Sequence, residues 1–208
     1  MLLIKYTKQD NAKYIPHVDM LRQISRILRR AGITVKFSQG FNPHELIYFA
    51  PPIPLCMSST AEYCAISTEE KASSFIEKFN SVSIEGITCV NVVEVEKNPN
   101  IAGKAVGAKY KVICNDQNFE SLKQAFNKDS YEITYSHKGE QITKEVRPLM
   151  FSLTKGEGFA EVELAHGNVN LRADRFFDSL GISICDVEKI EEQIEVDGKR
   201  VSCDVLFE

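Results

Sequence analysis

Apolar residues recur at helical spacing between residues 18 and 31, and they alternate with polar residues in several shorter runs elsewhere in the chain. A stripe of this width predicts an amphipathic helix whose apolar face packs on a core. Gly32 tolerates a left-handed backbone and is therefore expected to end that helix. The stripe consists of Met20, Leu21, Ile24, Ile27, Leu28 and Ala31.

The other apolar runs predict strands and helices in an order that starts again near the middle of the chain. For the first half we expect strands at 2–7, 34–38, 46–50, 61–67 and 87–95, and a second helix at 68–80 with Thr68 as its N-cap. For the second half we expect strands at 109–114, 131–136, 141–146, 150–153, 160–164 and 182–194, and helices at 118–127 and 173–180.

Each half therefore begins with a strand and ends with a helix followed by a strand, an order close to the split βαβ of ferredoxin-like domains. Asn98-Pro99-Asn100 has the composition of a linker between the halves. The sequence predicts an α+β protein made of two tandem ferredoxin-like domains with antiparallel sheets. The expected boundaries are residues 1–97 and 104–208.

Composition narrows the class of protein. The chain of 208 residues has no apolar run long enough to cross a membrane and no signal-peptide pattern at its start, which predicts a cytoplasmic protein without a membrane partner. Its six cysteines include no CxxC pair, so reduced thiols are expected rather than disulfides.

Charge is distributed unevenly along the chain. Residues 1–44 carry eight Lys or Arg and two Asp, a local charge of +6; because the net charge is -4, residues 45–208 carry -10. A basic region on an acidic body indicates local recognition of an anion such as phosphate or RNA, or docking on an acidic partner. The alternative is that these are ordinary solvated helix charges.

The basic helix leads into a glycine-centred turn, Phe37-Ser38-Gln39-Gly40-Phe41-Asn42-Pro43-His44. Outward-pointing backbone N–H groups there would suit an anion, and an aromatic ring could stack on an RNA base. In the alternative, the segment is only a tight turn and Phe41 fills the core. The candidate substrate- or anion-binding residues are Arg22, Arg26, Arg29, Ser38, Gln39, Gly40, Phe41 and Asn42.

Two histidines flank this region and are the candidate catalytic residues. His17 opens the predicted helix, where the helix dipole disfavours the protonated ring and leaves a neutral imidazole that can act as a base. His44 closes the turn. No spacing of His, Cys, Asp or Glu predicts a metal site, and the nucleotide, dinucleotide, zincin and α/β-hydrolase motifs are missing, so neither a metal nor a cofactor is predicted.

The stretch from residue 14 to residue 63 resembles the radical SAM-linked proteins, a bacterial family built on a domain of unknown function. The resemblance lies in His17-Val18-Asp19, the arginine helix, the 37–44 turn, the Pro51-Pro52-Ile53-Pro54-Leu55 segment and Ala61-Glu62-Tyr63. The chain departs from the family pattern at Pro16, where Ser is usual, and at Glu45, where Pro is usual.

The resemblance implies a radical SAM protein as partner, because family members are fused to one or encoded beside one. Since this chain lacks a CxxxCxxC cluster motif, we expect an accessory subunit that presents a substrate or binds RNA, in RNA or ribosome-related modification. Two alternatives stay open. One is a stand-alone ribonuclease-like enzyme with a histidine as general acid or base, and the other is a pure protein-docking module.

Overall fold

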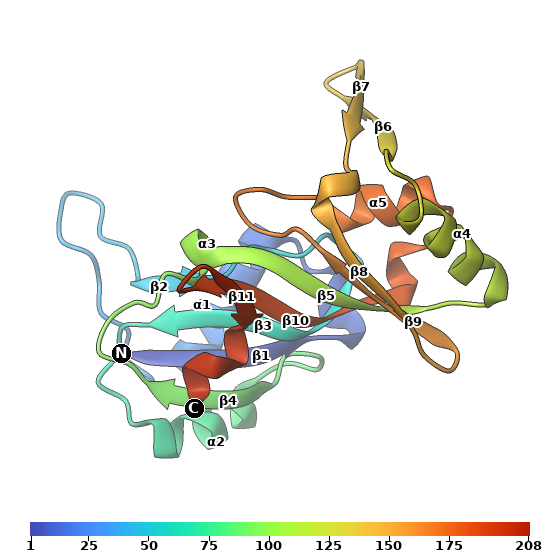
Figure 1. Cartoon of the computed structure of the whole chain (residues 1–208). Coiled ribbons are helices and arrows are strands. Elements are labelled where there is room, and N and C mark those ends of the chain that lie inside the picture. Colours follow the sequence, from blue (N-terminus) through green and yellow to red (C-terminus); the bar gives the residue numbers. More distant parts are fainter.

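The computed structural model describes every residue from Met1 to Glu208 (Figure 1). The first half places its strands in the order β4-β1-β3-β2, with every neighbouring pair antiparallel. Its two helices connect β1 to β2 and β3 to β4. The elements are β1 (Leu2–Lys8), α1 (His17–Arg30), β2 (Ile47–Phe49), β3 (Ser58–Ile66), α2 (Ala72–Val82) and β4 (Cys89–Glu94).

The second half follows a short helix, α3 (Ile101–Lys104), and places its strands in the order β10-β5-β9-β8, again antiparallel throughout. A separate hairpin, β6-β7, projects from the body (Figure 1). The elements are β5 (Ala105–Ile113), α4 (Asp116–Phe126), β6 (Glu132–His137), β7 (Glu140–Glu145), β8 (Met150–Lys155), β9 (Phe159–Leu164), α5 (Ala173–Ser179), β10 (Val187–Val196) and β11 (Lys199–Ser202).

Strand β10 joins the two halves into one nine-stranded sheet. It lies between β5, to which it runs antiparallel, and β3, to which it runs parallel. The parallel pairing is short, with Glu188 opposite Ser58 and Lys189 opposite Ser59. The predicted α+β class with antiparallel sheets is confirmed for this mostly antiparallel sheet, whereas the ferredoxin-like assignment and the boundaries at 97 and 104 stay predictions.

Three apolar clusters hold the sheet and helices together. One lies under α1 and α2, where Ile24, Ile27 and Leu28 have no exposed surface. A second lies under α4 and α5, and it includes Ile53 and Met57 from the first half. A third covers the junction and contains Leu3, Ile194 and Cys203. Burying a large apolar side chain contributes roughly 1.5–3 kcal/mol, so the insertion of Ile53 and Met57 into the second cluster ties the halves together.

Local signals in the sequence account for most elements, but not for all of them. The strand predicted at 182–194 begins only at Val187, because Ile184–Asp186 form a 3-10 turn. Gly32 does end α1, with a φ of 70°. The strand predicted at 34–38 is wrong, because only single bridges form there, from Val35 to Thr68 and from Phe37 to Glu45. The predicted N-cap is also wrong: Thr68 donates its hydroxyl to the Thr34 carbonyl, and α2 begins only at Ala72.

None of the helices combines the length and the apolar character needed to span a lipid bilayer.

Candidate functional site

Residues 37–45 form a projecting arm at the surface (Figure 1). Its base is closed by the Phe37–Glu45 bridge and by Ser38. The Ser38 amide donates to the His44 carbonyl at 2.8 Å, and the Ser38 hydroxyl lies 2.9 Å from His44 Nδ1. The Ser38 N–H is therefore engaged within the arm and cannot join a row of free amide donors.

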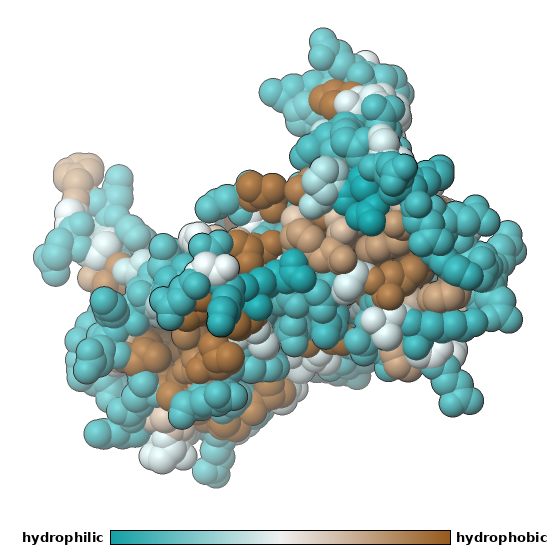
Figure 2. Space-filling model, in the orientation of Figure 1, coloured by the Kyte–Doolittle hydropathy of each residue, from teal (hydrophilic) through white to brown (hydrophobic).

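The tip of the arm is fully open to solvent. Phe41 is 100% exposed, so it does not fill the core. Gln39 and Asn42 are also exposed, and their side chains make no hydrogen bond within the protein. Gly40 has a φ of 125°, a conformation that side-chain-bearing residues rarely adopt. Figure 2 shows the arm standing away from the body with an apolar group at its end.

Glu45 fastens the base of the arm to α1. Its carboxylate accepts hydrogen bonds from Arg29 Nε at 3.0 Å and Nη2 at 2.9 Å, and from the Ser25 hydroxyl. Arg22 is paired as well, with its Nη1 2.9 Å from Asp19 Oδ1. Two of the three predicted anion-binding arginines are thus engaged by the protein's own carboxylates.

Arg26 and Arg30 are exposed and have no carboxylate partner. Together with Arg29, Gln23 and Ile84 they line a depression of about 450 Å³ on the outer face of α1. At this depression, the unpaired guanidinium groups of the basic helix are available to a ligand. The assignment of all three arginines to one anion site stays a prediction.

The structure places the two candidate catalytic histidines in different surroundings. His17 packs edge-on against Phe49, with ring centroids 6.4 Å apart. Burial lowers the pKa of its imidazole, with Lys8 acting in the same direction and Glu62 against it. His44 bonds to Ser38 instead, and no hydrogen bond joins the two histidines. Their catalytic role stays a prediction.

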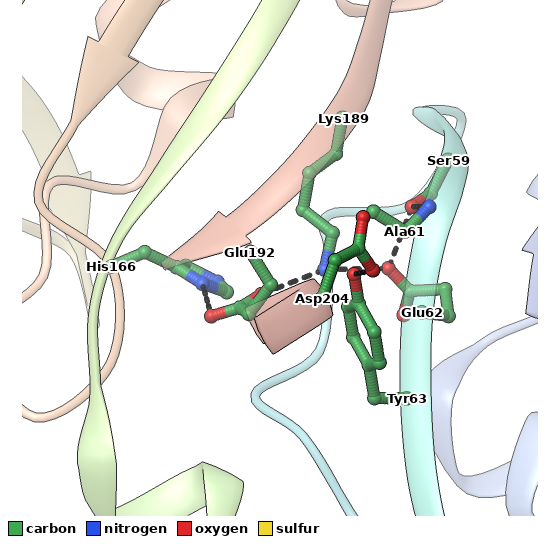
Figure 3. Close-up of polar contacts among 8 residues, drawn as sticks. All are labelled: Ser59, Ala61, Glu62, Tyr63, His166, Lys189, Glu192 and Asp204. Atoms are coloured by element: carbon green, nitrogen blue, oxygen red, sulfur yellow. Dashed lines mark hydrogen bonds and ion pairs between the residues drawn. The ribbon is translucent and has the colours of Figure 1, made fainter. Parts of the chain in front are cut away.

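A polar network that the sequence does not predict lies at the junction of β3 and β10; we call it the junction network (Figure 3). Lys189 Nζ lies 2.7 Å from Glu62 Oε1 and 2.9 Å from Glu192 Oε2. The Ser59 hydroxyl donates to Glu62 at 2.8 Å, and His166 Nδ1 lies 2.9 Å from Glu192 Oε1. All five residues are buried.

Mutual pairing keeps the central charges of this network in place. Burial by itself would lower the pKa of Lys189, but Glu192 and Glu62 outweigh it and raise that pKa. Burial would likewise raise the pKa of Glu192, but Lys189 and His166 hold it below the ordinary value. A buried ion pair persists when its partners are hydrogen-bonded in this way.

A neighbouring polar group extends from the same sheet toward its outer edge. Asp204 accepts hydrogen bonds from Lys5 at 2.7 Å and from the Tyr63 hydroxyl at 2.8 Å, and Figure 3 shows it close to the network. The one hint of these interactions in the sequence is the presence of charged residues inside predicted strands, such as Glu62 and Lys189. Nothing in the sequence says which of them meet.

Comparison with known proteins gives a family match and similarity to solved structures. No curated protein matches the chain. Among solved structures, the chain is similar to one described as "Crystal Structure of a Cbf5-Nop10-Gar1 Complex", with 10% identity and a TM-score of 0.44. The alignment covers 92% of this chain and 48% of that one, so the chain spans about half the length of its structural relative.

The family model described as "Uncharacterized protein conserved in bacteria (DUF2344)" matches residues 1–173, which include the arm, α1 and the buried histidine of the junction network. The chain therefore belongs to this family of uncharacterised bacterial proteins.

Proposed function

We propose that the protein is an accessory subunit that binds single-stranded RNA and presents it to a radical SAM enzyme in the cytoplasm. The proposal of RNA binding is supported by two kinds of exposed group. One is an aromatic ring at the tip of the arm, and the other is the set of unpaired guanidinium groups on α1, the helix to which the arm is attached. Phe41 is 100% exposed on the arm, and Glu45 attaches the arm to α1, which carries the unpaired Arg26 and Arg30.

Single-stranded nucleic acid binding combines these two kinds of group. Cationic side chains neutralise the phosphates, and an aromatic ring stacks on a base whatever its identity. An exposed phenylalanine makes no contribution to a core, so the ring at the arm tip is available for an interaction outside the chain. The radical SAM partner is proposed from the resemblance of residues 14–63 to the radical SAM-linked proteins.

The proposal includes an architecture. We infer that each half is a ferredoxin-like unit, with the first covering residues 1–97 and the second 104–208. This inference is supported by the strand order, which is the same in each half when the β6-β7 hairpin is left out. In both halves the fourth strand lies beside the first, the first beside the third and the third beside the second, as in the split βαβ.

The test of RNA binding uses the double reversal Arg26→Glu with Arg30→Glu and a fluorescently labelled, unstructured RNA of 12 nucleotides. We expect the affinity to fall at least about tenfold, and the salt dependence of binding to become shallower by about 0.7 in slope for each phosphate that is no longer neutralised. The matched control is Lys97→Glu with Lys199→Glu, which makes the same change in net charge at two exposed lysines that have no ion pair. RNA binding that is equal in the two double variants would overturn the proposal.

The aromatic interaction is tested separately with Phe41→Ala. Loss of one stacked base costs about 1–3 kcal/mol, which corresponds to roughly a 5- to 150-fold weaker complex. The partner is tested by co-purification of the chain with a radical SAM protein encoded beside it. If the arginine reversal abolishes co-purification while RNA binding was never present, the chain is a docking module instead.

A further inference from the structure

A second concave site lies at the junction of the two halves, away from the arm. It has a volume of about 230 Å³. Its walls come from the segment between β2 and β3, from β5 and from the segment that leads into α5. The lining residues are Pro52, Ile53, Pro54, Tyr110, His166, Asn170, Arg172 and Ala173.

Two side chains in this cavity are almost fully buried and still have an uncommitted polar atom. Tyr110 is 1% exposed, and its hydroxyl makes no hydrogen bond within the protein. His166 is 4% exposed, and its one side-chain partner is Glu192, which leaves Nε2 free. Gln193 Oε1 is the one side-chain polar atom that is both fully enclosed and without a partner. The Tyr110 hydroxyl and His166 Nε2 also lack a partner, so they are not fully enclosed, and both residues line the cavity. Buried polar atoms nearly always have a partner, so these two atoms require one from inside the cavity.

The junction network fixes the orientation of His166. Lys189 keeps Glu192 ionised, and an ionised carboxylate can only accept a hydrogen bond. Nδ1 must therefore carry a proton, and Nε2 is the ring nitrogen left for a ligand. Figure 3 shows the imidazole held with one edge against Glu192. The cavity thus has a preoriented imidazole nitrogen beside a hydroxyl that can donate or accept.

The arginine that lines the cavity is paired with a carboxylate of the protein. Arg172 Nε donates to Asp174 at 3.0 Å and its Nη2 pairs with the same carboxylate at 2.5 Å. The opposite wall is apolar, with Pro52, Ile53 and Pro54. A flat molecule with both hydrogen-bond donors and acceptors matches this combination of polar atoms and an apolar wall.

Size restricts the ligand further. Sites for drug-sized molecules usually measure about 300–1,000 Å³, so this cavity suits a smaller, single-ring or fused-ring molecule. We propose that the junction cavity binds one nucleobase, with His166 and Tyr110 reading its hydrogen-bonding edge and the Pro52–Pro54 segment covering its face. The inference deepens the proposed function and rests on it for the identity of the ligand as a nucleobase. The base belongs either to the bound RNA, where it is splayed out from the strand, or to a free nucleoside.

The experiment follows the four histidines of the ¹⁵N-labelled protein by NMR. The His166 signals are assigned with His166→Gln. The protein is titrated separately with adenosine, guanosine, cytidine and uridine, and then with the 12-nucleotide RNA. We expect the His166 Nε2 signal to move with at least one of these probes. Movement with nucleosides shows recognition of the free base, and movement with RNA alone shows recognition of a base within the strand.

The control variants separate recognition from folding. Tyr110→Phe removes only the uncommitted hydroxyl and keeps the packing, and Asn170→Ala alters an exposed residue at the mouth. Each should weaken binding of the probe that moves the signal by about three- to tenfold, the effect expected for one neutral hydrogen bond. A probe whose affinity is unchanged in both variants overturns the inference.

The outcomes also distinguish this inference from the proposed function. If the His166 signal stays still while the RNA binds through Arg26 and Arg30, the cavity inference fails and RNA binding stands. If nucleosides move the signal although the RNA binds neither the wild type nor the Arg26→Glu, Arg30→Glu variant, the cavity inference stands and the proposed function fails.

Discussion

The outer face of α1 and the junction network are both rows of charged side chains, but their surroundings differ in nearly every physical respect. On α1 the arginines are exposed, and each pair is surrounded by solvent on at least one side; Arg29 in its pair with Glu45 is 67% exposed. In the junction network, Lys189 and Glu192 have no exposed surface. The first group can exchange its partners for water or for an anionic ligand, whereas the second cannot.

The comparison separates charged groups that are available for binding from charged groups on which the stability of the fold depends. A surface ion pair contributes little because solvent screens it, so an arginine there is free to be used for binding. A buried pair costs desolvation energy and is strongly destabilising when one partner is removed. Changes to both groups of charges test that division, beginning with the largest expected effect.

Lys189→Met should destabilise the fold by about 3–5 kcal/mol, because it leaves Glu62 and Glu192 buried without their shared cation. Urea unfolding followed by circular dichroism measures the change. Lys199→Met, at an exposed position on the neighbouring strand β11, is the control and should alter stability by less than about 0.5 kcal/mol. If the two variants unfolded at the same urea concentration, the buried ion pairs of the network would contribute no more to stability than an exposed lysine.

The stability of the wild-type protein should depend on pH through the same groups. The folded-state pKa of Glu192 lies below 4.5, so its contribution is present above that pH and is lost as pH falls through the folded value. The pKa of Lys189 lies above 10.5, so its contribution is complete below pH 10.5 and is lost as pH rises through the folded value. Urea midpoints measured between about pH 3 and pH 7 should therefore fall at the acid end.

The Glu192→Gln variant sharpens this pH test. Glutamine does not titrate, so the variant should be less stable at neutral pH and should lose less further stability on acidification than the wild type. Equal acid sensitivity in both proteins would mean that other carboxylates dominate the pH dependence.

Arg29→Ala should have a small effect, about 0.5 kcal/mol, because Glu45 loses its partner at the base of the arm while solvent already screens the arginine. Arg26→Ala, which breaks no pair, should leave the free energy of unfolding unchanged within error. Thermal unfolding of the two single variants side by side makes the measurement. A larger destabilisation for Arg26 than for Arg29 would show that the division between paired and free arginines is mistaken.

The sequence predicts those structural elements that depend on interactions between residues close together in the chain, and it does not predict those that depend on distant residues. The helix α1 and its end at Gly32 depend on neighbours within a few residues, and both are predictable from the apolar spacing. The arm is predictable as a turn because Gly40 and Pro43 favour one, but the exposure of Phe41 depends on how the arm leaves the body. The helix predicted to start at Thr68 begins only at Ala72, because Thr68 forms a bridge with the distant Val35 and its hydroxyl both donates to the Thr34 carbonyl and accepts from the Glu70 amide.

The hairpin β10-β11 had a local signal that was not used. Asp197-Gly198 has positive φ at both residues, 50° and 73°, as the favoured two-residue hairpin turn requires. The junction network had no such signal. Glu62 and Lys189 lie in opposite halves of the chain, and only the pairing of β3 with β10 brings them together, so their roles emerge only from the folded topology.

The late position of β10 in the chain governs when the molecule can be completed. This strand is central to the sheet, yet it lies at residues 187–196, more than 70 residues after β5. During synthesis on the ribosome, β5 and the start of β3 keep one edge each unpaired until β10 emerges from the exit tunnel. Between the synthesis of β5 and that of β10, a nascent chain therefore carries two unpaired strand edges that could pair with another chain.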